Sequence, residues 1–220
     1  MKTTIVLLTL NEIEGVKQVV PQINRKWASE IICIDGGSND GTIEWLRSRK
    51  IPVHVQKIRG RAEAFRLGLK TAKGDAIVYF SPDGNEDPYD IPRITKKINE
   101  GYDLVIASRF SKKSRSDDAT AVRRFGNNFF TLLVNIFWNA GVTDAINGFR
   151  GITKKCLTDL GIDAKRFEVE IEMTIRAAKK GYKIAEIPTY EKARIGGEAK
   201  LRTFKDGWIY ARTLMRELVR

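Results

Sequence analysis

The turn that follows the run Ile77–Phe80 carries the side chains best suited to chemistry. The run is β-branched and aromatic, which is typical of a buried strand, and Pro82 and Gly84 end it. The turn holds four oxygen-bearing side chains: Asp83, Asn85, Glu86 and Asp87. Such donors suit Mg²⁺ or Mn²⁺, and a divalent cation in turn holds a diphosphate. The same residues are also compatible with an acidic Pro/Gly turn that binds nothing.

A second acidic turn follows the apolar stretch Glu30–Asp35. Its residues, Gly36–Gly41 (GGSNDG), tolerate positive φ. Because ligands of open α/β sheets bind at the carboxyl ends of the strands, we expect Asp35 and Asp83 at the same edge. One turn could serve the base and ribose of a nucleotide, and the other a metal and the diphosphate. Asp35 could instead cap the helix that begins at Thr42.

The sequence lacks the residues that several other kinds of site require. GGSNDG does not have the G-x-G-x-x-G spacing of dinucleotide-binding proteins, and the sequence contains no Walker A motif. Cys33 and Cys156 have no metal-ligand spacing, and His54 is the only histidine. These facts disfavour a dinucleotide fold, an ATPase, a zinc site and a Cys/His or Ser/His/Asp hydrolase.

Strands and helices alternate over the first half of the chain. We expect strands at Thr3–Leu10, Glu30–Asp35, Val53–Gln56, Ala76–Phe80 and Leu104–Ser108, and helices at Ile13–Ile23 with a break at Pro21, Thr42–Arg49, Arg61–Ala72 and Pro92–Glu100. This order, with its short connections, predicts an α/β fold with a mostly parallel, doubly wound sheet and flanking helices.

The pattern changes after Phe110. A polar loop is expected at Ser111–Ala121. Further along we expect an apolar helix within Arg123–Gly141, a loop at Asp144–Arg150 that enters a short strand, a helix at Phe167–Lys180, a strand at Lys183–Pro188, a basic loop at Glu191–Thr203 and a helix at Phe204–Arg220. No linker or repeat is visible, so we expect one domain over residues 1–220.

Charge and hydropathy favour an anionic partner. The 220 residues carry 39 basic and 27 acidic side chains, a net charge of +12. The apolar run Phe129–Trp138 is too short to span a bilayer, but Arg123 and Arg124 precede it and Trp138 ends it. This pattern is typical of a helix in the membrane interface, with a core helix as the alternative. We find no nucleic-acid-binding motif and no signal peptide, so we expect a cytoplasmic protein without a nucleic-acid partner.

Short motifs follow one another along the chain. They are TLNE (Thr9–Glu12), IICIDGGSNDGT (Ile31–Thr42), GRAEA (Gly60–Ala64), SPDGN (Ser81–Asn85), SR (Ser108-Arg109), NGFR (Asn147–Arg150), FEVE (Phe167–Glu170), EIP (Glu186–Pro188) and RIGGEAKL (Arg194–Leu201). With these motifs, from about Thr3 to Leu201, the chain resembles family 2 glycosyltransferases with the GT-A fold. The resemblance is to the branch that includes the dolichyl-phosphate mannose and glucose synthases.

The resemblance implies an inverting enzyme that moves a sugar from a nucleoside-diphosphate sugar to a polyprenyl (dolichyl) phosphate. About residues 1–110 would bind the nucleotide sugar, through Thr9, Asn11, Glu12, Asp35, Gly36, Arg61, Ser81, Pro82 and Asp83. Mg²⁺ or Mn²⁺ would lie on Asp83 and Asn85. About residues 111–220 would form the acceptor half, and the lipid phosphate would be held by Arg109, Arg123, Arg194 and Lys200. The enzyme would lie peripherally on the cytoplasmic face of a membrane.

Two positions depart from the pattern of this family. Gly36 replaces the second of two paired aspartates, which would loosen recognition of the base or ribose. Ser81 replaces the first aspartate of D-x-D, so that one expected carboxylate is missing. Glu86 or Asp87 could substitute for it, and the resemblance leaves a metal-independent enzyme open.

Asp144 admits two interpretations. It could pair with Arg109, or it could act as a base if the acceptor is a sugar hydroxyl. A lipid phosphate is already an anion at neutral pH and needs no strong base. The alternatives to the lipid-phosphate acceptor are a hydroxyl of a glycan or glycolipid, and a non-catalytic protein that binds a nucleotide.

Overall fold

The computed structural model describes residues 1–195 and 203–220. Its strands are β1 (Thr3–Thr9), β2 (Glu30–Asp35), β3 (Val53–Val55), β4 (Ala76–Phe80), β5 (Leu104–Ser108), β6 (Arg115–Ser116), β7 (Arg150–Thr153), β8 (Ile184–Pro188) and β9 (Tyr190–Glu191). Its helices are α1 (Ile13–Val19), α2 (Thr42–Ser48), α3 (Arg61–Thr71), α4 (Asp90–Asn99), α5 (Ala121–Trp138), α6 (Lys154–Leu160), α7 (Val169–Lys179) and α8 (Thr203–Val219), with 3₁₀ helices η1 (Val20–Gln22) and η2 (Arg25–Trp27).

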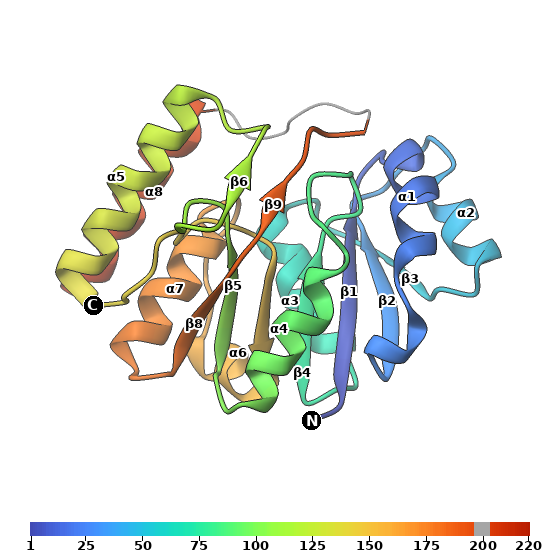
Figure 1. The fold of residues 1–220 in the computed structure, drawn as a ribbon, viewed down its shortest axis with the longest axis horizontal. Coiled ribbons are helices and arrows are strands. Elements are labelled where there is room, and N and C mark those ends of the chain that lie inside the picture. The colour runs from blue at the N-terminus through green and yellow to red at the C-terminus, as the bar shows by residue number, and fades with distance from the viewer. Residues whose placement is uncertain (196–202) are drawn as a thin grey trace.

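A seven-stranded sheet in the order β3-β2-β1-β4-β7-β5-β8 forms the centre of the molecule (Figure 1). β7 runs antiparallel to β4 and β5, and the other neighbouring pairs are parallel. The predicted α/β fold with a mostly parallel, doubly wound sheet is therefore confirmed. Parallel neighbours need crossover connections, and helices supply them between successive strands of the first half.

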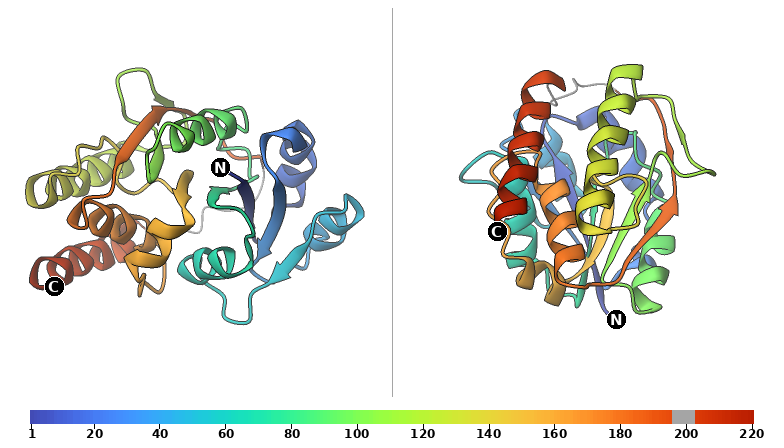
Figure 2. Two further views of the ribbon diagram at one scale, coloured as in Figure 1. Left: turned by 90° about the horizontal axis from the view of Figure 1, so that it is seen from below. Right: turned by 90° about the vertical axis from the view of Figure 1, so that its left-hand side faces the viewer.

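Apolar side chains point alternately to the two faces of the sheet and form an apolar layer on each. In β1, Ile5 and Leu7 point to the face covered by α1, α2 and α4, whereas Val6 and Leu8 point to the face of α3, α6 and α7. Figure 2 shows these helices on opposite sides of the sheet. Because every residue of β1 is buried, the strand has no polar face and reads as a continuous apolar run.

Helices α5 and α8 lie side by side beyond α7, at one end of the sheet (Figures 1 and 2). A network of ion pairs joins α7 to α8. The guanidinium of Arg176 lies 2.6 Å from Glu172, 2.8 Å from Glu217 and 3.1 Å from Asp163. In the part of the chain that the structure describes, no helix combines the length and apolar character needed to cross a membrane.

The second half differs in detail from the sequence prediction. Helix α5 begins at Ala121, because the Thr120 hydroxyl accepts a hydrogen bond from the backbone N–H of Arg123 and caps the helix. The expected loop at Ser111–Ala121 contains β6, which pairs in parallel with β9. The prediction also omitted α6, whose start is capped by Thr153.

Candidate active site

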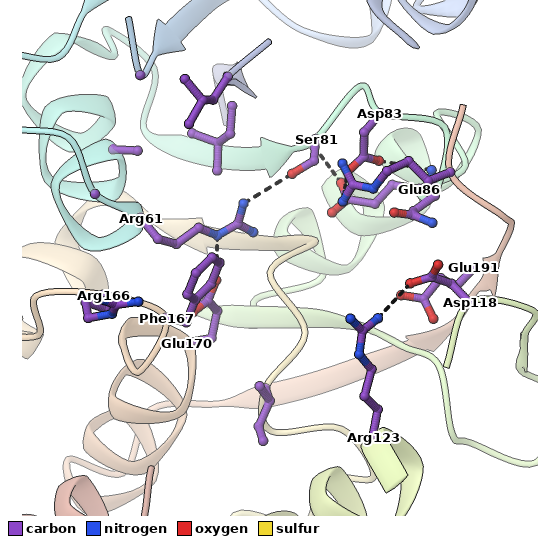
Figure 3. Close-up of a pocket in the computed structure, with 18 of the residues that line it drawn as sticks. Arg61, Ser81, Asp83, Glu86, Asp118, Arg123, Arg166, Phe167, Glu170 and Glu191 are labelled. Atoms are coloured by element: carbon purple, nitrogen blue, oxygen red, sulfur yellow. Dashed lines mark hydrogen bonds and ion pairs between the residues drawn. The ribbon is translucent and has the colours of Figure 1, made fainter. Parts of the chain in front are cut away.

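A cavity of about 550 Å³ opens where β1, β2 and β4 end (Figure 3). Its walls combine these strand ends with residues of α3, α5, α7 and α8 and of the segment after β9. Ligands of open α/β sheets bind at this edge, and the volume is ordinary for a small-molecule site. The cavity is therefore the candidate active site.

Asp83 lies in the cavity wall at the end of β4 and is 6% exposed. Its Oδ2 lies 2.9 Å from the guanidinium of Arg194, which also lies 3.0 Å from Oε1 of Glu12. Its Oδ1 accepts a hydrogen bond from the backbone N–H of Asn85. Burial raises the pKa of Asp83, although Arg194 opposes the rise. The structure thus brings three predicted residues, Glu12, Asp83 and Arg194, into one cluster.

Arg61 lies beside Ser81 in the same wall (Figure 3). Its Nε donates to Oε1 of Glu170 at 2.7 Å, and its Nη1 donates to the Ser81 hydroxyl at 3.3 Å. Gly148 makes this position possible, because a Cβ there would lie 1.9 Å from Nη2 of Arg61. The guanidinium is therefore held at the strand end where an anionic ligand would bind.

Glu86 and Asp87, both possible substitutes for the missing aspartate, occupy different places. The turn after β4 folds back so that Oε2 of Glu86 accepts a hydrogen bond of 2.6 Å from the backbone N–H of Ser81. Glu86 lines the cavity, and burial together with the charge of Asp83 raises its pKa to about 8. The Asp87 carboxylate instead accepts from the backbone N–H of Tyr89, at the start of α4.

The structure corrects the interpretation of Asp35. Its side chain is fully buried and accepts hydrogen bonds from the Thr9 hydroxyl, the Ser38 hydroxyl and the backbone N–H groups of Gly37 and Ser38. These bonds occupy both carboxylate oxygens, so Asp35 shapes the turn and offers nothing to a nucleotide. The expected cap of α2 is also wrong for this residue, because Asp40 accepts from the backbone N–H of Thr42.

The other predicted nucleotide residues divide into two groups. Thr9, Glu12, Gly36 and Ser81 line the cavity. Asn11 and Pro82 are not part of its wall. The Asn11 side chain accepts from the backbone N–H of Asn39 and so ties together the turns after β1 and β2. We therefore assign Asn11 a structural contact in place of the expected ligand contact.

Arg109 and Asp144 form a bidentate ion pair near the wall of the cavity opposite Arg61 and Asp83. Nε and Nη2 of Arg109 donate to the two carboxylate oxygens of Asp144 at 2.7 and 3.0 Å. Asp144 is fully buried and is not part of the cavity wall, whereas Arg109 is. The prediction that Asp144 could act as a base is thus corrected, because the carboxylate cannot reach a substrate and instead positions Arg109.

Arg123 also faces the cavity, from the start of α5, and lies 3.4 Å from Asp118 (Figure 3). Beside it, Asn127 is 6% exposed, and its Nδ2 has no hydrogen-bond partner among the described residues. The cavity thus has a second pair of arginines, Arg109 and Arg123. Both are ion-paired: Arg109 with Asp144 and Glu191, and Arg123 with Asp118. Lys200, predicted to assist them, lies outside the described residues.

The donor atoms of the cavity fit a divalent cation that arrives with a diphosphate. Within residues 1–195 and 203–220, no three His, Cys, Asp or Glu side chains form a metal-binding group. Mg²⁺ is usually held by one or two carboxylates together with substrate phosphates, so such a group is not required. Oε2 of Glu170 is buried without a hydrogen-bond partner in the described part of the chain, and Glu86 has no ion pair there. Asp83, Glu86 and Glu170 therefore offer carboxylate oxygens to a cation.

Glu170 and Asn127 line the cavity, although the sequence predicts neither as a site residue. Glu170 stands in the FEVE motif, whose residues the sequence alone gives no role, and Asn127 stands in a helix whose pattern is dominated by apolar residues. Glu170 could have been suspected, because an acidic residue among the apolar positions of α7 needs a buried partner. Asn127 carries no such signal.

Comparisons with known proteins agree with this arrangement. Residues 4–161 match the family model described as glycosyl transferase family 2. The chain is 28% identical over 214 residues to a dolichyl-phosphate hexose transferase of Haloferax volcanii, covering 96% of this chain and 92% of that protein. It is 27% identical over 212 residues to a dolichol-phosphate mannosyltransferase of Pyrococcus furiosus, covering 92% and 60%.

The fold is similar to that of glucosyl-3-phosphoglycerate synthase of Mycobacterium tuberculosis, solved with Mn²⁺, uridine diphosphate and glucosyl-3-phosphoglycerate. The TM-score is 0.75 at 22% identity, over 99% of this chain and 78% of the other. At this identity the likeness shows the fold, which is GT-A. The protein is a glycosyltransferase similar to the polyprenyl-phosphate sugar synthases. The family model spans most of the chain, which therefore belongs to glycosyl transferase family 2.

Proposed function

We propose that this glycosyltransferase moves a sugar, with inversion, from a nucleoside diphosphate to a polyprenyl phosphate at a membrane surface. One observation carries the proposal: a single cavity has carboxylates and arginines at the strand ends, two further arginines opposite, and an exposed apolar helix beside it. The names of two relatives, which specify dolichyl or dolichol phosphate, support this acceptor class. A structural neighbour in complex with uridine diphosphate supports the donor class.

The strand ends would bind the donor. Arg61 and Arg194 present guanidinium groups to the diphosphate, and such forks bind phosphate oxygens in pairs. Asp83 and Asn85 remain our proposed holders of a divalent cation, which when bound supplies Lewis-acid stabilisation of the departing diphosphate. Arg194 would exchange its ion pair with Asp83 for one with the diphosphate, which keeps both charges paired.

The opposite wall would bind the acceptor. Arg109 and Arg123 hold the phosphate, and Asp144 fixes the orientation of the Arg109 guanidinium. The acceptor oxygen is already ionised, so attack on the anomeric carbon requires no general base, and Asp144 need not reach it. A single displacement from the face opposite the diphosphate inverts that carbon. The protein contributes alignment and charge stabilisation.

The outer face of α5 supports a membrane-bound acceptor. Large apolar side chains are exposed along it at intervals of three and four residues: Val122, Phe125, Phe129, Leu132 and Ile136. Val122 also lines the cavity, so the apolar face begins at the site itself. On the adjacent α8, Trp208 is 74% exposed. Exposed apolar helices with arginines at one end bind anionic lipid surfaces, and we propose that this face rests on one.

Thermal unfolding with UDP, GDP and their common sugar conjugates, each with and without Mn²⁺, tests the donor end. A ligand at a hundredfold its Kd stabilises by about 2.7 kcal/mol. For a chain of 220 residues this corresponds to a rise of roughly 5–10 °C in Tm. The donor identified in this way is then supplied with vesicles that contain or lack polyprenyl phosphate. Sugar transfer that depends on the lipid phosphate is expected.

Two results would overturn the proposal. Transfer to a sugar hydroxyl without lipid phosphate would assign a different acceptor. Binding of a nucleotide without transfer to any acceptor would favour a non-catalytic nucleotide-binding protein. Vesicle co-sedimentation of the Phe125→Asp variant tests the membrane face, because a charge at a 74% exposed position of α5 should reduce binding without unfolding the protein.

A further inference from the structure

Ser81 leaves the turn after β4 one carboxylate short of the expected metal-binding pattern. The first carboxylate expected in the turn after β4 is absent, because Ser81 stands there. Asp83 alone is a weak basis for a divalent cation, since hard cations are held by several oxygen ligands. Its carboxylate is also shared with Arg194. If a cation accompanies the donor, a second carboxylate at the same place would strengthen its binding.

Glu86 supplies a carboxylate there. Its Oε2 accepts from the backbone N–H of Ser81, so the carboxylate lies against the residue whose own acid is missing (Figure 3). Its other oxygen, Oε1, receives no hydrogen bond from the part of the chain that the structure describes. Both Asp83 and Glu86 line the cavity, and their mutual repulsion contributes to the raised pKa of Glu86.

The neighbouring arginines form ion pairs with carboxylates other than that of Glu86. Arg61 is engaged by Glu170, and Arg194 is engaged by Asp83. Glu86 forms no ion pair within residues 1–195 and 203–220, and the second oxygen of Glu170 is buried there without a partner. A cation that enters with a diphosphate would bring together one free oxygen of Glu86 and the carboxylate of Asp83.

We propose that Glu86 replaces the missing acid of position 81, so that Glu86 joins Asp83 and Asn85 in holding the divalent cation of a nucleoside diphosphate. The proposal rests on the proposed function for its ligand class. Asp87, the alternative acid, is excluded from this role because its carboxylate accepts from the backbone N–H of Tyr89 and lies outside the cavity wall.

Binding of Mn²⁺, alone and with UDP or GDP, tests the proposal without requiring turnover. The free Mn²⁺ signal in electron paramagnetic resonance reports the bound fraction directly. Losing even an outer partner of a metal costs about 10- to 100-fold in affinity, so Glu86→Gln should weaken Mn²⁺ binding at least about tenfold. The matched control Asp87→Asn should bind Mn²⁺ like the wild type. Glutamine keeps an oxygen for the Ser81 N–H, so the turn should persist.

A double variant makes the test independent of any damage to the fold. Ser81→Asp combined with Glu86→Gln moves the acid to the strand end and should restore Mn²⁺ binding. Equal affinity of Glu86→Gln and wild type, equal loss in Asp87→Asn, failure of the double variant to recover, or no Mn²⁺ binding by the wild type would each overturn the proposal. Mn²⁺ binding that follows this pattern without sugar transfer would sustain it while refuting the proposed function.

Discussion

Replacing Asp144 by asparagine should lower the stability of the protein, because Asp144 holds Arg109 in the wall of the cavity that we propose for the acceptor. Three hydrogen bonds of Arg109, from its backbone N–H, Nε and Nη2, end on the Asp144 carboxylate. The side chain of Asp144 is 0% exposed and that of Arg109 19% exposed, so removing the negative charge leaves a poorly hydrated guanidinium. Breaking a buried pair on one side costs about 3–5 kcal/mol, and we expect about 3 kcal/mol because asparagine retains one acceptor oxygen and Arg109 keeps its ion pair with Glu191 at 3.3 Å.

This loss is large enough to measure by thermal or chemical unfolding. For a chain of 220 residues, each kcal/mol corresponds to about 2–4 °C, so Asp144→Asn should lower Tm by about 6–12 °C. Asp118→Asn is the matched control. Its pair with Arg123 spans 3.4 Å between side chains that are 34% and 27% exposed, and such pairs contribute about 0–1 kcal/mol.

Enzyme kinetics distinguishes a positioning role of Asp144 from a catalytic one. If Asp144 positions Arg109, Asp144→Asn should raise the KM for the lipid phosphate more than it lowers kcat. A variant with wild-type Tm and abolished turnover would refute the reasoning, because it would mean that the carboxylate acts on the substrate in spite of its burial.

Three further changes test other parts of the molecule. Gly148→Ala should displace the Arg61 guanidinium, since the added Cβ would lie 1.9 Å from Nη2, and should weaken nucleoside-diphosphate binding about ten- to hundredfold in calorimetry. Asp40 should contribute to acid sensitivity: burial tends to raise its pKa, but hydrogen bonds from the starts of α2 and α1 outweigh burial and lower it. A lowered pKa stabilises the fold above the unfolded value, so this contribution should disappear as the pH falls below about 4, and Asp40→Asn should flatten the denaturation profile there. Glu217→Gln should destabilise by about 1–3 kcal/mol, because it removes one of the three carboxylates that pair with Arg176, and an unchanged free energy of unfolding in urea would contradict that role.

The sheet could be predicted because its signal is local. Buried parallel strands are continuous apolar runs bounded by turn residues, and β1, β2, β4 and β5 have this form. The two-stranded pairing of β6 with β9 could not be predicted in the same way. Each strand has two residues, and its hydrogen bonds join segments that are far apart in the sequence.

The position of the site in the fold could be predicted more reliably than the role of each residue in it. Asp83 and Arg109 follow buried strands, and both face the cavity as expected. Asp35 and Asp144 also stand near strand ends. However, the carboxylate of Asp35 accepts hydrogen bonds from its neighbours, and that of Asp144 accepts them from Arg109. Whether a carboxylate points into a cavity depends on partners contributed by other segments, and spacing along the chain does not encode them. The choice between Glu86 and Asp87 likewise depends on how one turn folds.

The cavity is lined by residues from both expected halves of the chain, the nucleotide half and the acceptor half. Arg61 belongs to the first half, but Glu170 of α7 and Gly148 fix its guanidinium. Asp83 belongs to the first half, but Arg194 neutralises it, and backbone N–H groups of the segment after β9 donate to the turn beside it. The proposed donor end therefore depends on residues from both halves of the chain. Substitutions at Glu170 or Arg194 should consequently appear first as defects in nucleotide binding, although both residues lie on the side of the chain assigned to the acceptor.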